Sequence, residues 1–318
     1  MEDNCENSSS FFNIFWRKEE GIEMSGRIEG NTMKNHLPEL AYCIGKKAWQ
    51  ALQEEVYTTP KPGLVDLYSC GAHTDMNVST FEKSARALYP YFMKMAASGY
   101  GMQIAPDELF REIRKTGVEA EKAMYQATVG VNTHKGLLFT IGIFCAAAGR
   151  CVREYGKITE RNLFEMEQEM VTEILAKEVR NIEAKDPETH GEKNFKRYGT
   201  SGIRGEALKG YPAVRYIALP ILRQGIMEKR EWNLVKLQTL FYLMREVEDS
   251  NIISRQNPEV LRQVHREADG FLKCGGAYAT DAIEKLKQMD AEYIRRNISA
   301  GGCADLLAAA IFVESLLR

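Results

Sequence analysis

The sequence predicts an all-α protein folded as a single large helical domain, and three observations support this prediction. Apolar residues recur at spacings of three and four in Leu234, Leu237, Phe241, Met244 and Val247, which places them on one face of a helix. Alternating strand patterns bounded by Asn-Gly or Asp-Gly turns are missing. The 318 residues, 44% of them hydrophobic, are enough to bury a large core.

The first 35 residues differ in composition from the rest of the chain. They contain a serine triplet at residues 8–10, an aromatic patch at residues 11–16 and a polar, glycine-containing stretch at residues 21–31. This composition predicts a poorly ordered N-terminal extension, followed by an all-helical domain over residues 36–318.

Three further segments of the domain predict helices. Residues 136–148 are apolar all round and too few to cross a membrane, which predicts a central, buried helix. Residues 159–182 predict an amphipathic surface helix, and residues 304–317 a strongly apolar one. The charged residues 183–200 predict a long surface connection, of the kind that often serves as a lid.

Composition and termini exclude several classes of protein. The seven cysteines are scattered and never spaced as CxxC, which argues against a disulfide scaffold and a zinc knuckle. A net charge of -2 gives no overall attraction to nucleic acid or to an anionic membrane. No apolar run reaches the roughly 18 residues of a membrane span, and the N-terminus lacks a basic signal region. We therefore expect a cytoplasmic protein.

Residues 54–77 predict an irregular connection, because prolines and glycines interrupt them. Four polar side chains gather there: Lys61, Asp66, His73 and Asp75. Two carboxylates and an imidazole on a constrained loop can bind a divalent cation or act as acid and base. The alternative is a loop in which Asp75 or Asn77 only caps the helix beginning near residue 80.

Residues 130–136 lead directly into the predicted buried helix. Asn132 or Thr133 suits the capping position, and His134 and Lys135 follow. A helix start with free N–H groups and a nearby cation favours phosphate binding. The alternative is ordinary surface polarity. Because the helix behind is fully apolar, we expect its polar start to open onto solvent or a ligand.

Residues 198–206 and the following turn contain four glycines, which allow the backbone to approach a ligand closely. Arg204 offers a guanidinium for phosphate oxygens, and Glu206 adds a carboxylate. The segment matches neither the Walker A pattern nor GxGxxG, and a flexible connection would have the same composition.

Two aspartates lie in the last polar segments. Asp249 lies between a predicted helix and Ser250, Asn251 and Arg255, where helix capping is the alternative to binding. Asp305 is predicted in the first turn of the last apolar helix, where the dipole favours it, but its neighbours indicate a carboxylate that faces inward and needs a cation. Together, the five segments predict one composite site made where helices end.

Five segments resemble the triphosphoribosyl-dephospho-CoA synthase family, whose members serve citrate lyase and malonate decarboxylase. They are TPKPGLVDLYSCGAHTDMN, GVNTHKGLLFTIG, SGIRGEALKGYP, EDSNIISR and GGCADLLA, in order between residues 54 and 307. The chain has Ser299-Ala300-Gly301-Gly302 where the family often has Ser-Pro-Gly-Gly, a difference that we expect to alter only loop stiffness.

The resemblance implies an all-helical transferase that joins ATP to 3'-dephospho-CoA, releases adenine and forms 2'-(5''-triphosphoribosyl)-3'-dephospho-CoA. It further implies Mg²⁺ as cofactor, and an acyl carrier protein or the holo-synthase of citrate lyase as a possible partner. The carboxylates expected to bind Mg²⁺ are Asp66, Asp75, Asp249 and Asp305.

The remaining roles are distributed over the same segments. The residues expected to bind the nucleotide are Lys61, Asn132, Thr133, Lys135, Gly202, Arg204, Gly205, Ser250, Asn251 and Arg255. Glu206 or one of the other carboxylates, such as Asp66, is expected to act as the base, and His73 or His134 to protonate adenine. The spacing of these residues does not rank the assignments.

Two other function classes remain compatible with these residues. One is a metal-dependent glycohydrolase of nucleotides or ADP-ribose conjugates, in which water is the acceptor. The other is a non-catalytic assembly factor for an acyl carrier protein, in which residues 11–16 would make the contact.

Overall fold

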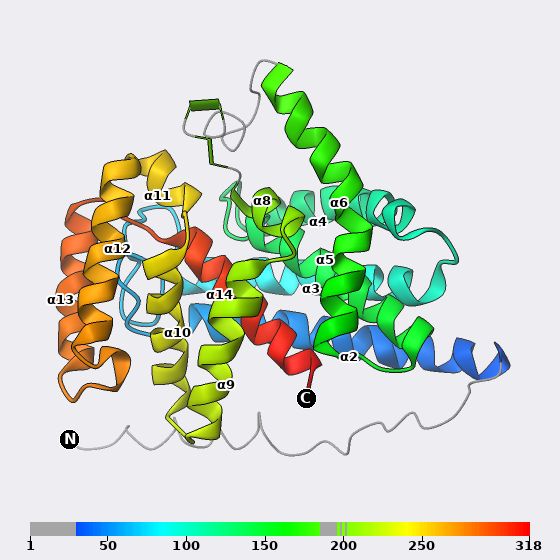
Figure 1. Ribbon diagram of the computed structural model, residues 1–318, viewed down its shortest axis with the longest axis horizontal. Coiled ribbons are helices and arrows are strands. Elements are labelled where there is room, and N and C mark those ends of the chain that lie inside the picture. Colours follow the sequence, from blue (N-terminus) through cyan, green and yellow to red (C-terminus); the bar gives the residue numbers. More distant parts are fainter. Residues whose placement is uncertain (1–29, 185–195, 198, 201) are drawn as a thin grey trace. The chain divides into compact units, whose positions relative to one another are not determined.

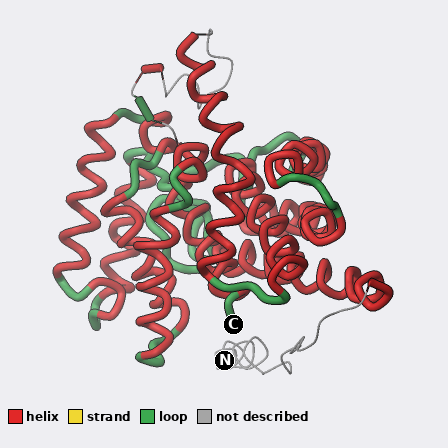
Figure 2. The backbone as a smooth tube through the Cα atoms, turned by 45° about the vertical axis from the view of Figure 1, so that its right-hand side comes forward, coloured by secondary structure: helices red, strands yellow, loops and turns green. Residues whose placement is uncertain are grey.

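The computed structural model describes residues 30–184, 196, 197, 199, 200 and 202–318. These residues form α-helices with one short π-helical and one short 3-10 segment, and Figures 1 and 2 draw no strand among them. The prediction of an all-α protein is thus confirmed. Most of the predicted extension, including the aromatic patch at residues 11–16, lies outside the described residues, as does most of the connection at residues 183–200.

The chain divides into two units, Met1–Lys34 and Asn35–Arg318, and the second contains every helix from α3 onward. Five long helices form its first part: α2 (Gly30–Val56, beginning in the first unit), α3 (Val78–Gly101), α4 (Pro106–Ala127), α5 (Lys135–Tyr155) and α6 (Glu160–Ala184). Among these, α3, α4, α5 and α6 pack on one another.

Shorter elements form the second part of this unit: α8 (Gly202–Leu208), the π-helical η1 (Ala213–Ala218), α9 (Leu219–Met227), α10 (Trp232–Glu246), α11 (Ser250–Arg255), α12 (Pro258–Lys273), the 3-10 segment η2 (Gly276–Tyr278), α13 (Ala282–Arg295) and α14 (Gly301–Leu316). Helix α14 contacts α5 in the first group and α10 and η1 in the second. Nearly all of its side chains are buried, so α14 joins the two groups through the core.

Helix α5 is the central, buried helix that residues 136–148 predict. The prediction that this helix is too short to cross a membrane is wrong. The helix continues to Tyr155 and, at 21 residues, is long and apolar enough to span. Its most apolar stretch is nevertheless 78% buried inside the protein, which identifies a core helix. Gly99 of α3 and Gly149 of α5 allow the two helices to cross closely, because an added Cβ would lie 2.0 Å from Ala146 O and 2.2 Å from Ala96 O.

The sequence also explains where several helices begin. Asn77 caps α3, since its side chain accepts the Thr80 N–H at 3.1 Å and the Thr80 hydroxyl accepts the Asn77 N–H in return. Asp75 does not cap this helix. Helix α6 is amphipathic as predicted, with Leu163, Met166 and Met170 buried. These helix ends position the polar segments considered next.

Candidate active site

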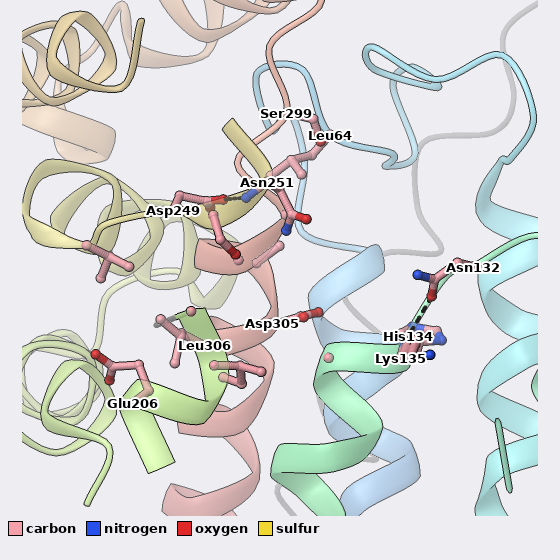
Figure 3. A pocket seen from close by; sticks show the side chains of 18 of the residues that line it. Leu64, Asn132, His134, Lys135, Glu206, Asp249, Asn251, Ser299, Asp305 and Leu306 are labelled. Carbon is pink, nitrogen blue, oxygen red and sulfur yellow. Dashed lines mark hydrogen bonds between the residues drawn. The ribbon is translucent and has the colours of Figure 1, made fainter. Parts of the chain in front are cut away.

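All five polar segments meet at one cavity of about 370 Å³ in the second unit. The lining includes His73, Asn132, Thr133, His134, Lys135, Gly202, Gly205, Glu206, Asp249, Ser250, Asn251, Arg255 and Asp305. Figure 3 shows Asp249, Asp305 and Glu206 on one side and the start of α5 on the other. The volume lies within the usual range for small-molecule sites.

Asp249 joins two helix starts at the cavity. Its Oδ1 accepts the N–H groups of Asn251 (2.8 Å) and Ile252 (3.3 Å) in α11, and its Oδ2 accepts the Cys303 N–H (2.8 Å) in α14. Burial raises the pKa of this carboxyl, although the three N–H groups oppose the shift. Gly302 permits the contact, because an added Cβ would lie 3.0 Å from Asp249 Oδ2.

Asp305 extends from α14 toward the start of α5 (Figure 3). Because α14 begins at Gly301, this residue lies in the second turn and not in the first, so the helix dipole accounts for it less well than the sequence indicated. Burial, together with the nearby charges of Glu55 and Asp249, raises the pKa of its carboxyl well above the usual value. A Cβ on Gly136 would lie 2.6 Å from Asp305 Oδ2, so α5 and the carboxylate meet only because residue 136 is glycine.

The start of α5 forms the opposite wall. Asn132 Oδ1 accepts the Lys135 N–H at 3.2 Å, while His134 occupies the capping position without making a side-chain cap. Lys135 Nζ pairs with Glu121 of α4 at 2.6 Å, so its charge is partly neutralised. The helix start itself remains the feature that favours an anion here.

The polar start of α5 opens onto the cavity, as expected, and His134 within it is buried. Its Nδ1 lies 2.7 Å from Ser84 Oγ of α3, and the ring of Phe81 packs against it edge to face. Burial and the charge of Lys61 lower the pKa of His134 to about 3. The ring is therefore neutral at physiological pH and cannot protonate adenine as an imidazolium.

His73 and Arg255 lie together at another part of the lining. His73 Nε2 is 3.0 Å from Ser299 Oγ, and Arg255 also donates to Ala72 O and Asn297 Oδ1. Burial and the positive charge of Arg255 lower the pKa of His73. This shift disfavours the protonated form that an acid requires.

Glu206 lies on α8 at the cavity wall. Its Oε2 accepts the Ala213 N–H at 3.1 Å, which closes the turn through Gly210 and Tyr211. Burial raises the pKa of this carboxyl, against the effects of that hydrogen bond and of Lys209. A carboxylate with a raised pKa is a stronger base than an exposed one.

Comparisons with known proteins show the family to which the chain belongs. A family model described as CitG, ATP:dephospho-CoA triphosphoribosyl transferase, matches residues 41–318. The chain belongs to this family. It is 38% identical over 267 residues to a 2-(5''-triphosphoribosyl)-3'-dephosphocoenzyme-A synthase of Klebsiella pneumoniae, which covers 84% of this chain and 88% of the relative.

Two further relatives have similar names and coverage. The chain is 38% identical over 266 residues to the synthase of Escherichia fergusonii (83% of this chain, 88% of the relative). It is 35% identical over 280 residues to a probable synthase of Vibrio cholerae serotype O1 (88% of this chain, 90% of the relative). No solved structure matches the chain.

Four residues that the sequence indicated for the transferase site do not line the cavity: Lys61, Asp66, Asp75 and Arg204. Lys61 is only 1% exposed, and its ammonium pairs with the Glu55 carboxylate and donates to Glu55 O at 2.6 Å. Its charge compensates a buried carboxylate instead of lying free for phosphate.

Asp66 organises the loop at residues 54–77. Its carboxylate accepts the N–H groups of Lys61, Tyr68 (2.7 Å) and Ser69 (2.9 Å). Burial raises the pKa of Asp66 despite these bonds. Asp75 is exposed, and Arg204 is half-buried on α8. The cavity of the transferase is thus built without direct contact from these four side chains.

The sequence also missed residues that the structure places at or near the cavity. Glu55 in the last turn of α2 lines the cavity, Phe81 packs on His134, and Ser84 lies within hydrogen-bond distance of the His134 ring. Phe81 and Ser84 belong to an ordinary helical stretch, and Glu55, although within residues 54–77, has no local pattern that marks it as a cavity residue. In the described part of the chain, no three His, Cys, Asp or Glu side chains lie close enough to hold a metal ion by themselves.

Proposed function

We propose that the protein is a triphosphoribosyl-dephospho-CoA synthase, which joins ATP to 3'-dephospho-CoA and releases adenine. The product is 2'-(5''-triphosphoribosyl)-3'-dephospho-CoA. One observation carries the proposal: the five polar segments line a single cavity in a chain whose family is that of the ATP:dephospho-CoA triphosphoribosyl transferases.

The chemistry replaces one bond to ribose by another. The 2'-hydroxyl of dephospho-CoA attacks C1' of ATP, the bond from C1' to adenine breaks, and the triphosphate stays on the ribose. The hydroxyl loses a proton and the departing adenine gains one. Positive charge develops on the ribose ring, as in glycoside cleavage. The site must therefore bind a triphosphate, accept a proton from the hydroxyl and allow adenine to take one up.

The start of α5 is the proposed binding site for the triphosphate. In the described part of the chain, the N–H groups of Gly136 and Leu137 have no backbone acceptor, as is usual in the first turn of a helix. Anionic oxygens suit such groups and the helix dipole. Further contacts to the two nucleotides are proposed for the other lining residues that the sequence indicated: Asn132, Thr133, Lys135, Gly202, Gly205, Ser250, Asn251 and Arg255.

Glu206 is the proposed base for the 2'-hydroxyl. One of its oxygens is fixed by the Ala213 N–H, which orients the carboxylate at the cavity wall. The raised pKa places the group closer to neutral pH than an exposed glutamate. General-base help of this kind contributes roughly 10²–10⁴-fold to a rate.

Mg²⁺ is the proposed cofactor, and the donor chemistry of the cavity suits it. Asp249 and Asp305 provide carboxylate oxygens, and Asp305 has no hydrogen-bond partner in the described part of the chain. Mg²⁺ is usually bound by one or two carboxylates together with substrate phosphates, so a closed protein cage is not required. The ion would neutralise triphosphate charge beside these two carboxylates, whose mutual repulsion it would also relieve.

The product suggests the partners and the compartment. It is the precursor of a prosthetic group, so we propose that it passes to the holo-synthase or acyl carrier protein of citrate lyase, or to the equivalent proteins of malonate decarboxylase. ATP and dephospho-CoA are intracellular metabolites, which supports a cytoplasmic location.

Mass spectrometry tests the proposal. The protein is incubated with ATP, Mg²⁺ and 3'-dephospho-CoA. We expect a new species with the mass of the two substrates less adenine. Absence of this species, with both substrates recovered intact, would reject the proposed function.

A further inference from the structure

The His134 ring is held by a short chain of hydroxyl groups. Its Nδ1 lies 2.7 Å from Ser84 Oγ, and the Thr133 hydroxyl donates to the same oxygen at 2.7 Å. Ser84 is fully buried in α3 and the His134 residue is 2% exposed. The three side chains therefore form a fixed connection from the cavity wall to the ring.

The donors and acceptors along this chain of hydroxyl groups can select one tautomer of His134. A serine hydroxyl has one proton to donate. When Thr133 donates to Ser84 Oγ, as their distance of 2.7 Å allows, the proton of Ser84 is left to donate to Nδ1 of His134. A neutral imidazole has one acceptor and one donor nitrogen, so the ring carries its proton on Nε2.

This Nε2 is buried and has no hydrogen-bond partner in the described part of the chain. A buried donor without an acceptor costs free energy, so its presence points to a partner that binds at this place. His134 is one of the residues that line the cavity, and it directly precedes α5, where backbone N–H groups favour an anion.

We propose that Ser84 is a positioning residue that holds His134 as the Nε2–H tautomer, and that this N–H donates to an oxygen of the ATP triphosphate. The proposal rests on ATP being the substrate, as in the proposed function. A neutral donor suits this place, because Lys61 lies close enough to disfavour a second positive charge. Ser84 acts only through His134.

Nitrogen NMR on protein labelled with ¹⁵N-histidine tests both parts of the proposal. The variant His134→Gln assigns the His134 signals among the five histidines. We expect Nδ1 to be unprotonated and Nε2 protonated at neutral pH. On addition of ATP or of inorganic tripolyphosphate the Nε2 signal should shift, whereas adenosine should leave it unchanged. A proton on Nδ1, or a shift produced by adenosine and not by tripolyphosphate, would overturn the proposal.

Variants separate positioning from a purely structural role. In Ser84→Ala we expect both tautomers to appear, with KM for ATP about tenfold higher, as the loss of one hydrogen bond to a charged group predicts, and with kcat within about twofold. In Thr133→Val we also expect both tautomers of His134, because Ser84 Oγ then loses its hydrogen-bond donor. Ser98→Ala is the control, since that hydroxyl donates only to Lys94 O on the same helix at 2.9 Å. A single Nε2–H tautomer in folded Ser84→Ala protein would overturn the role of Ser84.

The test can fail independently of the proposed function. If the expected product forms but ATP leaves the His134 signals unchanged, the inference is wrong and the transferase activity stands. If no product forms although tripolyphosphate shifts the Nε2 signal, anion binding by His134 stands and the proposed reaction is wrong.

Discussion

Asp249 and Cys303 are joined by a hydrogen bond of 2.8 Å, from the Cys303 N–H to Asp249 Oδ2. The other oxygen of the same carboxylate caps α11, so one side chain fixes the starts of α11 and α14 to each other. Both starts line the cavity. The geometry of the site therefore depends on a carboxylate that also stabilises the fold.

Replacement of Asp249 should lower the free energy of unfolding, more for alanine than for asparagine. Asp249→Ala leaves two helix starts without their acceptor, and loss of a cap costs about 1–2 kcal/mol for each. Asp249→Asn has a single acceptor oxygen and should lose about half as much. Urea unfolding measures both values. Asp281→Ala is the control, because Asp281 precedes α13 without capping it. Equal stability of Asp249→Ala and Asp281→Ala would contradict the bridging role.

Gly136→Ala should impair turnover without unfolding the protein. The added methyl would lie 2.6 Å from Asp305 Oδ2 and would push the carboxylate away from the start of α5. Misplacement of a reacting or binding group by about 1 Å costs on the order of 10²-fold in rate. Steady-state kinetics test this expectation. Gly270→Ala in α12 is the control, since nothing lies within 4 Å of its added Cβ. Full activity of folded Gly136→Ala would show that the position of Asp305 is unimportant.

Glu206→Gln should lower kcat by about 10²–10⁴-fold, since an amide cannot accept the hydroxyl proton. The amide oxygen can still accept the Ala213 N–H, so the melting temperature should change little. In the wild type, kcat should fall as pH drops through the raised pKa of Glu206, because only the ionised form acts as base. Glu248→Gln, at an exposed position of the same lining, serves as the control. A higher KM with unchanged kcat would assign Glu206 to binding instead.

Glu167→Gln should stabilise the protein at neutral pH. Glu167 is fully buried on α6, and neither of its carboxylate oxygens has a partner in the described part of the chain. Burial raises its pKa well above 4.5, so the folded state keeps a proton that the unfolded state releases. Stability of the wild type therefore falls as pH rises above about 4.5, by up to about 1.4 kcal/mol per pH unit until the folded pKa is reached.

Unfolding free energies measured from pH 4 to pH 8 test the Glu167 prediction. The difference between wild type and Glu167→Gln should vanish below about pH 4.5, where both states hold the proton, and should grow with pH. Exposed Glu173→Gln on the same helix should show no such trend. A constant difference across this range would mean that Glu167 is already ionised in the folded protein.

The helices could be predicted from the sequence because their apolar residues recur at helical spacing. Their ends could not be placed equally well: α14 starts at Gly301 and not at residue 304, which moves Asp305 out of the first turn. Glycines at positions 301 and 302 interrupt the apolar pattern, although the helix includes them. The start of α14 is bound by a carboxylate far away in the chain, Asp249, so the sequence around residue 301 does not indicate it.

The polar segments could likewise be found in the sequence, but which of their side chains face the cavity could not. Lys61 and Asp66 lie on the predicted loop, yet their partners are Glu55 and the loop backbone. His134 lines the cavity, yet its ring is fixed by contacts with Phe81 and Ser84 of α3 that the sequence does not show. These contacts depend on helix packing between segments that lie far apart in the chain.

The dependence of adenine release on dephospho-CoA tests the central claim most directly. Adenine is measured by chromatography after incubation with ATP and Mg²⁺, with and without 3'-dephospho-CoA. We predict that adenine appears only with the acceptor and in a 1:1 ratio to the triphosphoribosyl product. Release at the same rate without the acceptor, with ribose 5-triphosphate as the second product, would identify a glycohydrolase and contradict the account.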